Sequence, residues 1–111
     1  MNLDEKLREF ADIIKRTREF CELKQAKAVV ESKSDLSAKV AEFREKDREL
    51  FLGKYSGEEV RIRAARLNQL FEVLAKIPEV ERLLKAEKEF SEILQSVYKS
   101  ISGITSAGLK S

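Results

Sequence analysis

Histidine and tryptophan are absent from this 111-residue sequence, cysteine and proline occur once each, and glycine occurs four times. So few turn-forming residues argue against β-sandwiches, barrels and glycine-rich nucleotide-binding loops. Without histidine, the chain lacks the usual general base near neutral pH and the commonest zinc ligand. The lone Cys21 can form neither an internal disulfide nor a four-thiolate cluster, and its apolar helical position predicts a buried, inert thiol. We therefore expect a protein without enzymatic activity, metal or cofactor.

Long apolar runs are also missing, because none approaches the roughly 20 residues that a membrane-spanning helix needs. The first residues are charged where a secretory signal would be apolar. Charged residues make up 38% and hydrophobic residues 42%, yet the net charge is only +2. This balance is typical of amphipathic helices and is less basic than that of domains that bind nucleic acid through phosphate. We expect a cytoplasmic protein that contacts no membrane and does not bind nucleic acid directly.

Apolar residues recur at alternating spacings of three and four, which place them on one face of an α-helix. No stretch alternates with a period of two for long enough to make a strand. The sequence therefore predicts an all-α fold of about four to five helices, arranged as antiparallel hairpins or a bundle. The four apolar series begin at Leu3, Leu36, Val60 and Val80.

Turn chemistry marks the predicted breaks between these helices. Residues 32–35 interrupt the first helical region and offer Ser34 or Asp35 as the next N-cap. Residues 53–57 contain two glycines and form the clearest loop. Pro78 ends one helix and begins the last, because the residue before proline leaves the α region and proline is well suited to a first helical turn.

Thr17 leaves two alternatives open. It either lies within one helix from about Leu3 to Val30 or caps a second helix that begins near Arg18. Because threonine is a good N-cap and a poor core residue, we favour the break.

A single domain over residues 1–104 and a flexible tail over residues 105–111 are predicted, since the last residues are small and polar. Helices of this length are rods with narrow apolar seams, and a chain of this size buries only about two thirds of its unfolded surface. We therefore expect two chains to pair into a homodimer.

The best candidate for a partner or self-association surface precedes the predicted loop. Leu50, Phe51 and Leu52 are consecutive, and Tyr55 follows within the loop. Because consecutive helical positions are 100° apart, one helix face cannot bury all three. Either the tip of the hairpin covers them or a partner protein does. Asp47, in the same apolar series, is either a specificity contact to a partner helix or a charge at the rim.

Arg61, Arg63 and Arg66 form the densest basic group. Arg63 and Arg66 share a helix face, whereas Arg61 lies to one side. A weak RNA-binding role is the alternative function, and it would lose affinity steeply with salt. No aromatic residues interleave with the arginines to stack bases, so a solvated helix face explains them better.

The order of helices and breaks resembles the YlbF/YmcA family of small helical bacterial regulators, the com_YlbF group that includes the YheA-like proteins. The resemblance covers about residues 3–104. It is carried by residues 11–20, 40–45 and 77–90, of which 78–87 are the most distinctive.

This resemblance implies an all-helical protein that self-associates and acts as a non-enzymatic adaptor. Related small helical proteins or a ribonuclease are the implied partners. The implied processes are competence, sporulation and biofilm formation, through a phosphorelay and through mRNA processing by RNase Y. Some members hold iron–sulfur clusters with cysteines. Cys21 stands alone here, so no cluster is carried over, and a YheA-like paralogue is favoured.

Overall fold

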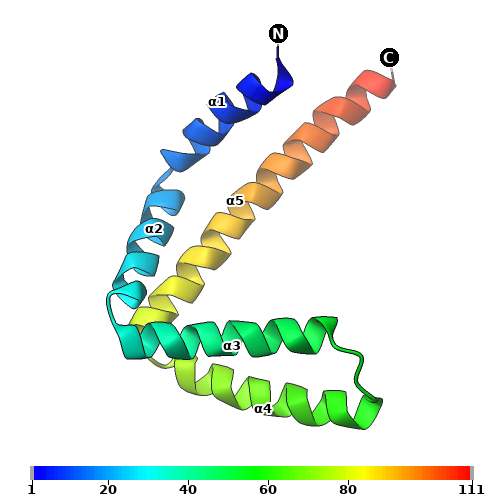
Figure 1. Ribbon diagram of the computed structural model, residues 1–111. Coiled ribbons are helices and arrows are strands. Elements are labelled where there is room, and N and C mark those ends of the chain that lie inside the picture. The colour runs from blue at the N-terminus through cyan, green and yellow to red at the C-terminus, as the bar shows by residue number, and fades with distance from the viewer. Residues whose placement is uncertain (1, 111) are drawn as a thin grey trace. The chain divides into compact units, whose positions relative to one another are not determined.

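The computed structural model describes residues 2–110, which form five α-helices and no strand (Figure 1). The all-α prediction is confirmed. Contacts divide the chain into two units, one of residues up to Gln25 and from Lys85 onward, the other of Ala26–Leu84. The helices are α1 (Leu3–Lys15), α2 (Arg18–Glu31), α3 (Ser34–Leu52), α4 (Gly57–Ala75) and α5 (Pro78–Leu109).

The predicted break at Thr17 is confirmed, and its hydroxyl group serves both neighbouring helices. The Thr17 Oγ1 accepts a hydrogen bond from the Phe20 N–H at 3.2 Å. It donates one to the Ile14 carbonyl oxygen at 2.7 Å. One side chain thereby satisfies a free donor at the start of α2 and a free acceptor at the end of α1.

The other predicted boundaries follow local chemistry with one exception. Ser56 caps α4 by accepting a hydrogen bond from the Glu59 N–H at 3.4 Å, and Pro78 is the first residue of α5. The prediction that Ser34 or Asp35 caps α3 is wrong, because the helix begins at Ser34 and Lys33 occupies the N-cap position. Both residues instead lie in the first turn of α3, where the positive end of the helix dipole stabilises the Asp35 carboxylate.

The second unit contains a small apolar core where the α2–α3 and α4–α5 turns meet. The ends of α2 and α4 and the beginnings of α3 and α5 all contribute to it. Farther along the α3–α4 hairpin, the Phe43 and Phe71 rings lie 5.7 Å apart between centroids. The core therefore holds one end of the hairpin. Its buried side chains are Ala26, Val30, Leu36, Leu74, Val80 and Leu83.

In the first unit, the start of α2 packs against α5. The Phe20 and Phe90 rings meet edge to face with centroids 5.6 Å apart. Cys21 is exposed, so the prediction of a buried thiol is wrong. Because Cys21 lies about 100° around the helix from Phe20, the two side chains leave in different directions. Its Sγ donates only a weak hydrogen bond to the Lys15 carbonyl oxygen, at 3.8 Å.

The C-terminal half of α5 continues as helix to Leu109. The Thr105 hydroxyl donates to the Ile101 carbonyl oxygen at 2.8 Å, and the side chains from residue 98 to residue 110 are exposed. Residues 105–109 are therefore helical where the sequence predicts a flexible tail. The division into one domain and a tail stays a prediction. Within residues 2–110, no helix is both long and apolar enough to cross a bilayer.

Candidate partner-binding site on the α3–α4 hairpin

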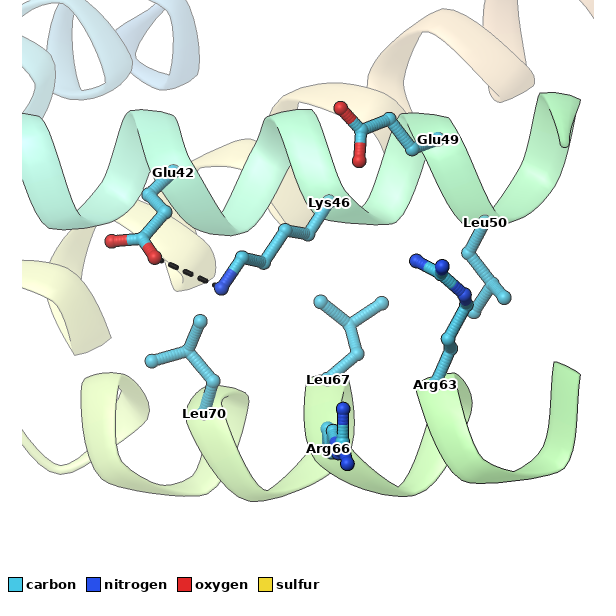
Figure 2. Close-up of a pocket in the computed structure, with 8 residues that line it drawn as sticks. All are labelled: Glu42, Lys46, Glu49, Leu50, Arg63, Arg66, Leu67 and Leu70. Atoms are coloured by element: carbon cyan, nitrogen blue, oxygen red, sulfur yellow. Dashed lines mark ion pairs between the residues drawn. The ribbon is translucent and has the colours of Figure 1, made fainter. Parts of the chain in front are cut away.

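Helices α3 and α4 lie side by side and are joined by a loop of four residues, 53–56, at one end (Figure 1). Toward this end, a groove of about 290 Å³ opens between them (Figure 2). Leucine side chains from both helices form its apolar part, and charged side chains of both signs surround them. It is lined by Glu42, Lys46, Glu49, Leu50, Arg63, Arg66, Leu67 and Leu70.

The charged rim of this groove is ordered by ion pairs within each helix. On α3, Lys46 Nζ lies 2.9 Å from Glu42 Oε1, one turn away (Figure 2). On α4, Arg63 donates to Glu59 Oε1 from Nε at 3.1 Å and from Nη2 at 3.0 Å. Acid-before-base pairs at this spacing add about 0.2–0.5 kcal/mol each to an exposed helix. Their main effect here is to position long side chains beside the leucines.

Arg63 also fixes the loop to α4. Its guanidinium carbon lies 4.1 Å from the centroid of the Tyr55 ring, a cation–π geometry. Tyr55 is half-buried, and its ring also covers Gly53, since a Cβ there would overlap the Tyr55 ring and lie 2.6 Å from the Glu49 carbonyl oxygen. Glycine therefore permits this close approach of the loop to α3.

The predicted surface residues separate into two groups. Leu50 is half-buried in the groove, and Tyr55 packs under Arg63. Phe51 is 87% exposed and Leu52 is 66% exposed, so the tip of the hairpin does not cover them. Coverage of this cluster by a partner protein stays a prediction. Asp47 is exposed, as expected for a charge at the rim.

The three arginines do not form one free basic surface. Arg61 Nη2 lies 3.0 Å from Glu58 Oε2, and Arg63 is paired with Glu59. Among residues 2–110, Arg66 has no ion pair, and it lines the groove. The sequence contained the signal for this neutralisation, because Glu58 and Glu59 precede their partners by three and four residues.

A second hollow, of about 220 Å³, lies along the same hairpin and is mainly apolar. Leu50 and Leu67 line both hollows, so they form a shared apolar ridge. Leu50 belongs to the apolar series that begins at Leu36, and Leu67 belongs to the series that begins at Val60, but these spacings do not show that the two series meet in one ridge. No three His, Cys, Asp or Glu side chains of the described residues are grouped in a way that could hold a metal ion.

The sequence pattern of a family described as control of competence regulator ComK, YlbF/YmcA, matches residues 3–105. The chain belongs to the Com_YlbF family. This confirms the resemblance drawn from the helices and breaks, and the family is linked to a regulatory role in the control of ComK. UPF0342 proteins of Caldicellulosiruptor bescii and Caldicellulosiruptor saccharolyticus are each 31% identical over 94 residues. These alignments cover 84% of this chain and 79% and 78% of the relatives. No solved structure matches this Com_YlbF chain significantly.

Proposed function

We propose that this Com_YlbF protein is a non-enzymatic, cytoplasmic adaptor that binds a protein partner at the loop end of the α3–α4 hairpin. The observation that carries the proposal is the exposure of two adjacent large apolar side chains, Phe51 and Leu52. They directly follow Leu50, which lines the groove. Apolar side chains gathered at an exposed tip and rimmed by charges are typical of protein–protein contact sites.

The groove favours an amphipathic helix as the bound segment. Its leucines offer a narrow apolar strip between two helices, which suits apolar residues at a spacing of three and four on a third helix. Glu49 and Arg66 lie on opposite helices of the groove, so a bound helix with charges of both signs would meet complementary groups. Small helical relatives and a ribonuclease such as RNase Y are the partners we propose, in the regulation of competence, sporulation and biofilm formation.

Direct RNA binding is less well supported by the same residues. Arg61 and Arg63 are already paired with acidic side chains of α4, which leaves less positive charge for phosphate. We therefore assign Arg66, which lines the groove, to recognition of the partner protein.

The experiment is affinity capture from lysate of the source organism by the tagged full-length chain, with and without nuclease. Three baits are compared: wild type, the double variant Phe51→Ala with Leu52→Ala, and the control Val73→Ala. Val73 is 65% exposed and lies near the other end of α4, so its variant removes apolar surface away from the tip.

We expect wild type and the control to capture a ribonuclease or small helical relatives, independently of nuclease, and the double variant to lose them. Equal capture by all three baits would place the contact elsewhere. Capture that disappears with nuclease would replace the adaptor role with RNA binding.

A further inference from the structure

The groove of the α3–α4 hairpin is lined by charges of both signs, but most of them are already paired within their own helix. Lys46 is paired with Glu42 on α3, and Arg63 is paired with Glu59 on α4. Each of these pairs is neutral in sum, so it adds little to the attraction of a charged ligand. The selectivity of the groove therefore depends on the charges that these pairs leave over.

Glu49 and Arg66 are the groove charges that remain. Across the part of the chain that the structure describes, neither side chain takes part in an ion pair. Arg48, the sequence neighbour of Glu49, is instead paired with Glu45, and its Nη2 lies 2.8 Å from the Glu45 Oε1. In Figure 2, Glu49 on α3 and Arg66 on α4 lie on either side of Leu67, at the same level along the groove. The groove thus has one acidic edge and one basic edge.

This arrangement distinguishes between classes of ligand. A polyanion such as a nucleic acid backbone would meet a single available cation with an acid facing it. An amphipathic helix carries side chains on both flanks of its apolar face, so it can offer a cation to α3 and an anion to α4 at once. Along α3 the groove extends from Glu42 to Leu50, which is about 12 Å, or roughly two turns of a bound helix. That length supplies a few apolar residues and about one charged residue on each flank.

Helix geometry then sets the sequence that the groove can recognise. In a helical segment of five residues that begins and ends with an apolar residue, the second and fourth residues lie about 80° to either side of the apolar face. These two residues are separated by only about 3 Å along the helix axis. They can therefore lie beside Glu49 and Arg66 at one level of the groove, one on each side.

We propose that the groove selects a partner helix with the pattern apolar–basic–x–acidic–apolar, or the same pattern with the two charges exchanged. The basic residue faces Glu49 and the acidic residue faces Arg66. Turning a bound helix end for end moves each flank to the other edge, where like charges oppose each other. The two patterns are therefore bound in opposite directions along α3. This inference rests on the proposed function and deepens it by naming the chemistry of the partner and the residues that orient it.

The test uses the full-length protein and four fluorescent peptides, each held helical by a lactam bridge on its exposed face. The peptides share one apolar face and differ only at the two flank positions, which are Lys–x–Glu, Glu–x–Lys, Glu–x–Glu or Lys–x–Lys. Fluorescence anisotropy with labelled peptide at low concentration gives each dissociation constant.

The variants Arg66→Glu and Glu49→Arg are compared with wild type and with the control Arg61→Glu. Arg61 is exposed and does not line the groove, so its variant reverses a charge of α4 away from the ligand. Glu49 and Arg66 are exposed as well, so the fold tolerates either change. Circular dichroism checks helix content, and Arg66→Gln or Glu49→Gln replaces a variant that loses it.

We expect wild type to bind both mixed peptides about fivefold more tightly than either peptide of a single sign, because a favourable contact at the rim gives way to a repulsive one. Arg66→Glu, with two acidic edges, should bind Lys–x–Lys best. Glu49→Arg, with two basic edges, should bind Glu–x–Glu best. Arg61→Glu should keep the wild-type order. The differences should shrink at high salt, since these charges are exposed.

The direction of binding is measured with a photo-cross-linker at the amino terminus of each mixed peptide. Lys–x–Glu and Glu–x–Lys should label opposite ends of the groove, one near Leu50 and the other near Glu42. Labelling of the same end by both peptides overturns the inference. So does one order of affinity shared by wild type and both groove variants, or failure of every peptide to bind.

The adaptor role is tested separately, by capture with Phe51 and Leu52 changed. Capture that depends on the tip, without any peptide preference, would refute this inference alone. Peptide preference together with capture that does not depend on the tip would refute the proposed adaptor contact alone.

Discussion

Lys33 and Glu79 are 46 positions apart in the sequence, and the Lys33 Nζ lies 2.6 Å from the Glu79 Oε2. The pair joins the turn before α3 to the first turn of α5, beside the core of the second unit. The lysine is about half-exposed, whereas the Glu79 side chain is only 24% exposed. The hydrogen bond from Lys33, aided by the backbone N–H of Glu79 itself, lowers the pKa of this carboxyl group. The pair therefore links folding of the second unit to pH.

Lys33→Met should make the stability of the protein less sensitive to acid. A carboxyl group whose pKa is lower in the folded chain contributes stability above its unfolded pKa of about 4.3, and loses it as pH falls through the lower folded pKa. Wild type should therefore exceed the variant in unfolding free energy near pH 7, with the difference disappearing in acid. Urea denaturation across this pH range measures it. Lys6→Met is the control, since Lys6 and Glu9 form an exposed pair one turn apart. Parallel pH profiles for wild type and Lys33→Met would contradict the linkage.

Gly53→Ala should destabilise the α3–α4 hairpin. The added Cβ would overlap the Tyr55 ring and approach the Glu49 carbonyl oxygen, which cannot move without disturbing α3. Such overpacking typically costs about 1–3 kcal/mol. Gly57→Ala is the matched control in the same connection, because nothing lies within 4 Å of its added Cβ. Thermal unfolding should show a lower midpoint for Gly53→Ala only. Equal midpoints for the two variants would contradict the packing of the Tyr55 ring over Gly53.

Leu74→Ala should be among the most damaging single truncations of α4. Leu74 is 4% exposed and belongs to the small core, whereas its neighbour Val73 is 65% exposed. Truncating a buried leucine costs about 2–5 kcal/mol, whereas surface changes usually stay within about 0.5 kcal/mol. Chemical denaturation of Leu74→Ala and Val73→Ala measures the difference. A similar loss in both would mean that the core lies elsewhere on α4.

Thr17→Ala should cost about 1 kcal/mol, because the free N–H at the start of α2 loses its side-chain acceptor. Thr17→Ser retains the hydroxyl group and should stay close to wild type. Urea titrations monitored by circular dichroism compare the three proteins. Equal losses for alanine and serine would show that the methyl group, not the hydrogen bonds, stabilises this junction.

Much of the fold was predictable because short-range chemistry sets the helix ends. Thr17, Ser56 and Pro78 act through groups within four residues, and their sequence neighbours are sufficient to identify them. Cys21 shows where such reasoning fails. Its predicted burial assumed one apolar series running on from Leu3, but the break at Thr17 resets the helix phase. The face of α2 is then chosen by Phe20 packing on α5, a contact between distant residues that spacing does not contain.

The candidate site was predictable only in part. An apolar cluster before the loop could be found from Leu50, Phe51 and Leu52 alone, since three consecutive apolar residues exceed what one helix face can bury. The groove depends on the register between α3 and α4, which brings Leu50 opposite Leu67 and Arg63 over Tyr55. That register is set by the conformation of the loop and by the Phe43–Phe71 contact, neither of which can be read from periodicity.

The α3–α4 hairpin is anchored at one end only. Its core contacts, Leu36 and Leu74, lie at the start of α3 and the end of α4, whereas Phe51 projects at the far end. Local unfolding free energy follows buried apolar contact, so amide hydrogen exchange should slow progressively from the tip toward the core. The core thus holds the hairpin at one end, and the loop end is the part that unfolds locally first. A partner that binds the tip would protect these amides from hydrogen exchange, so binding and local ordering of the hairpin end would be a single event.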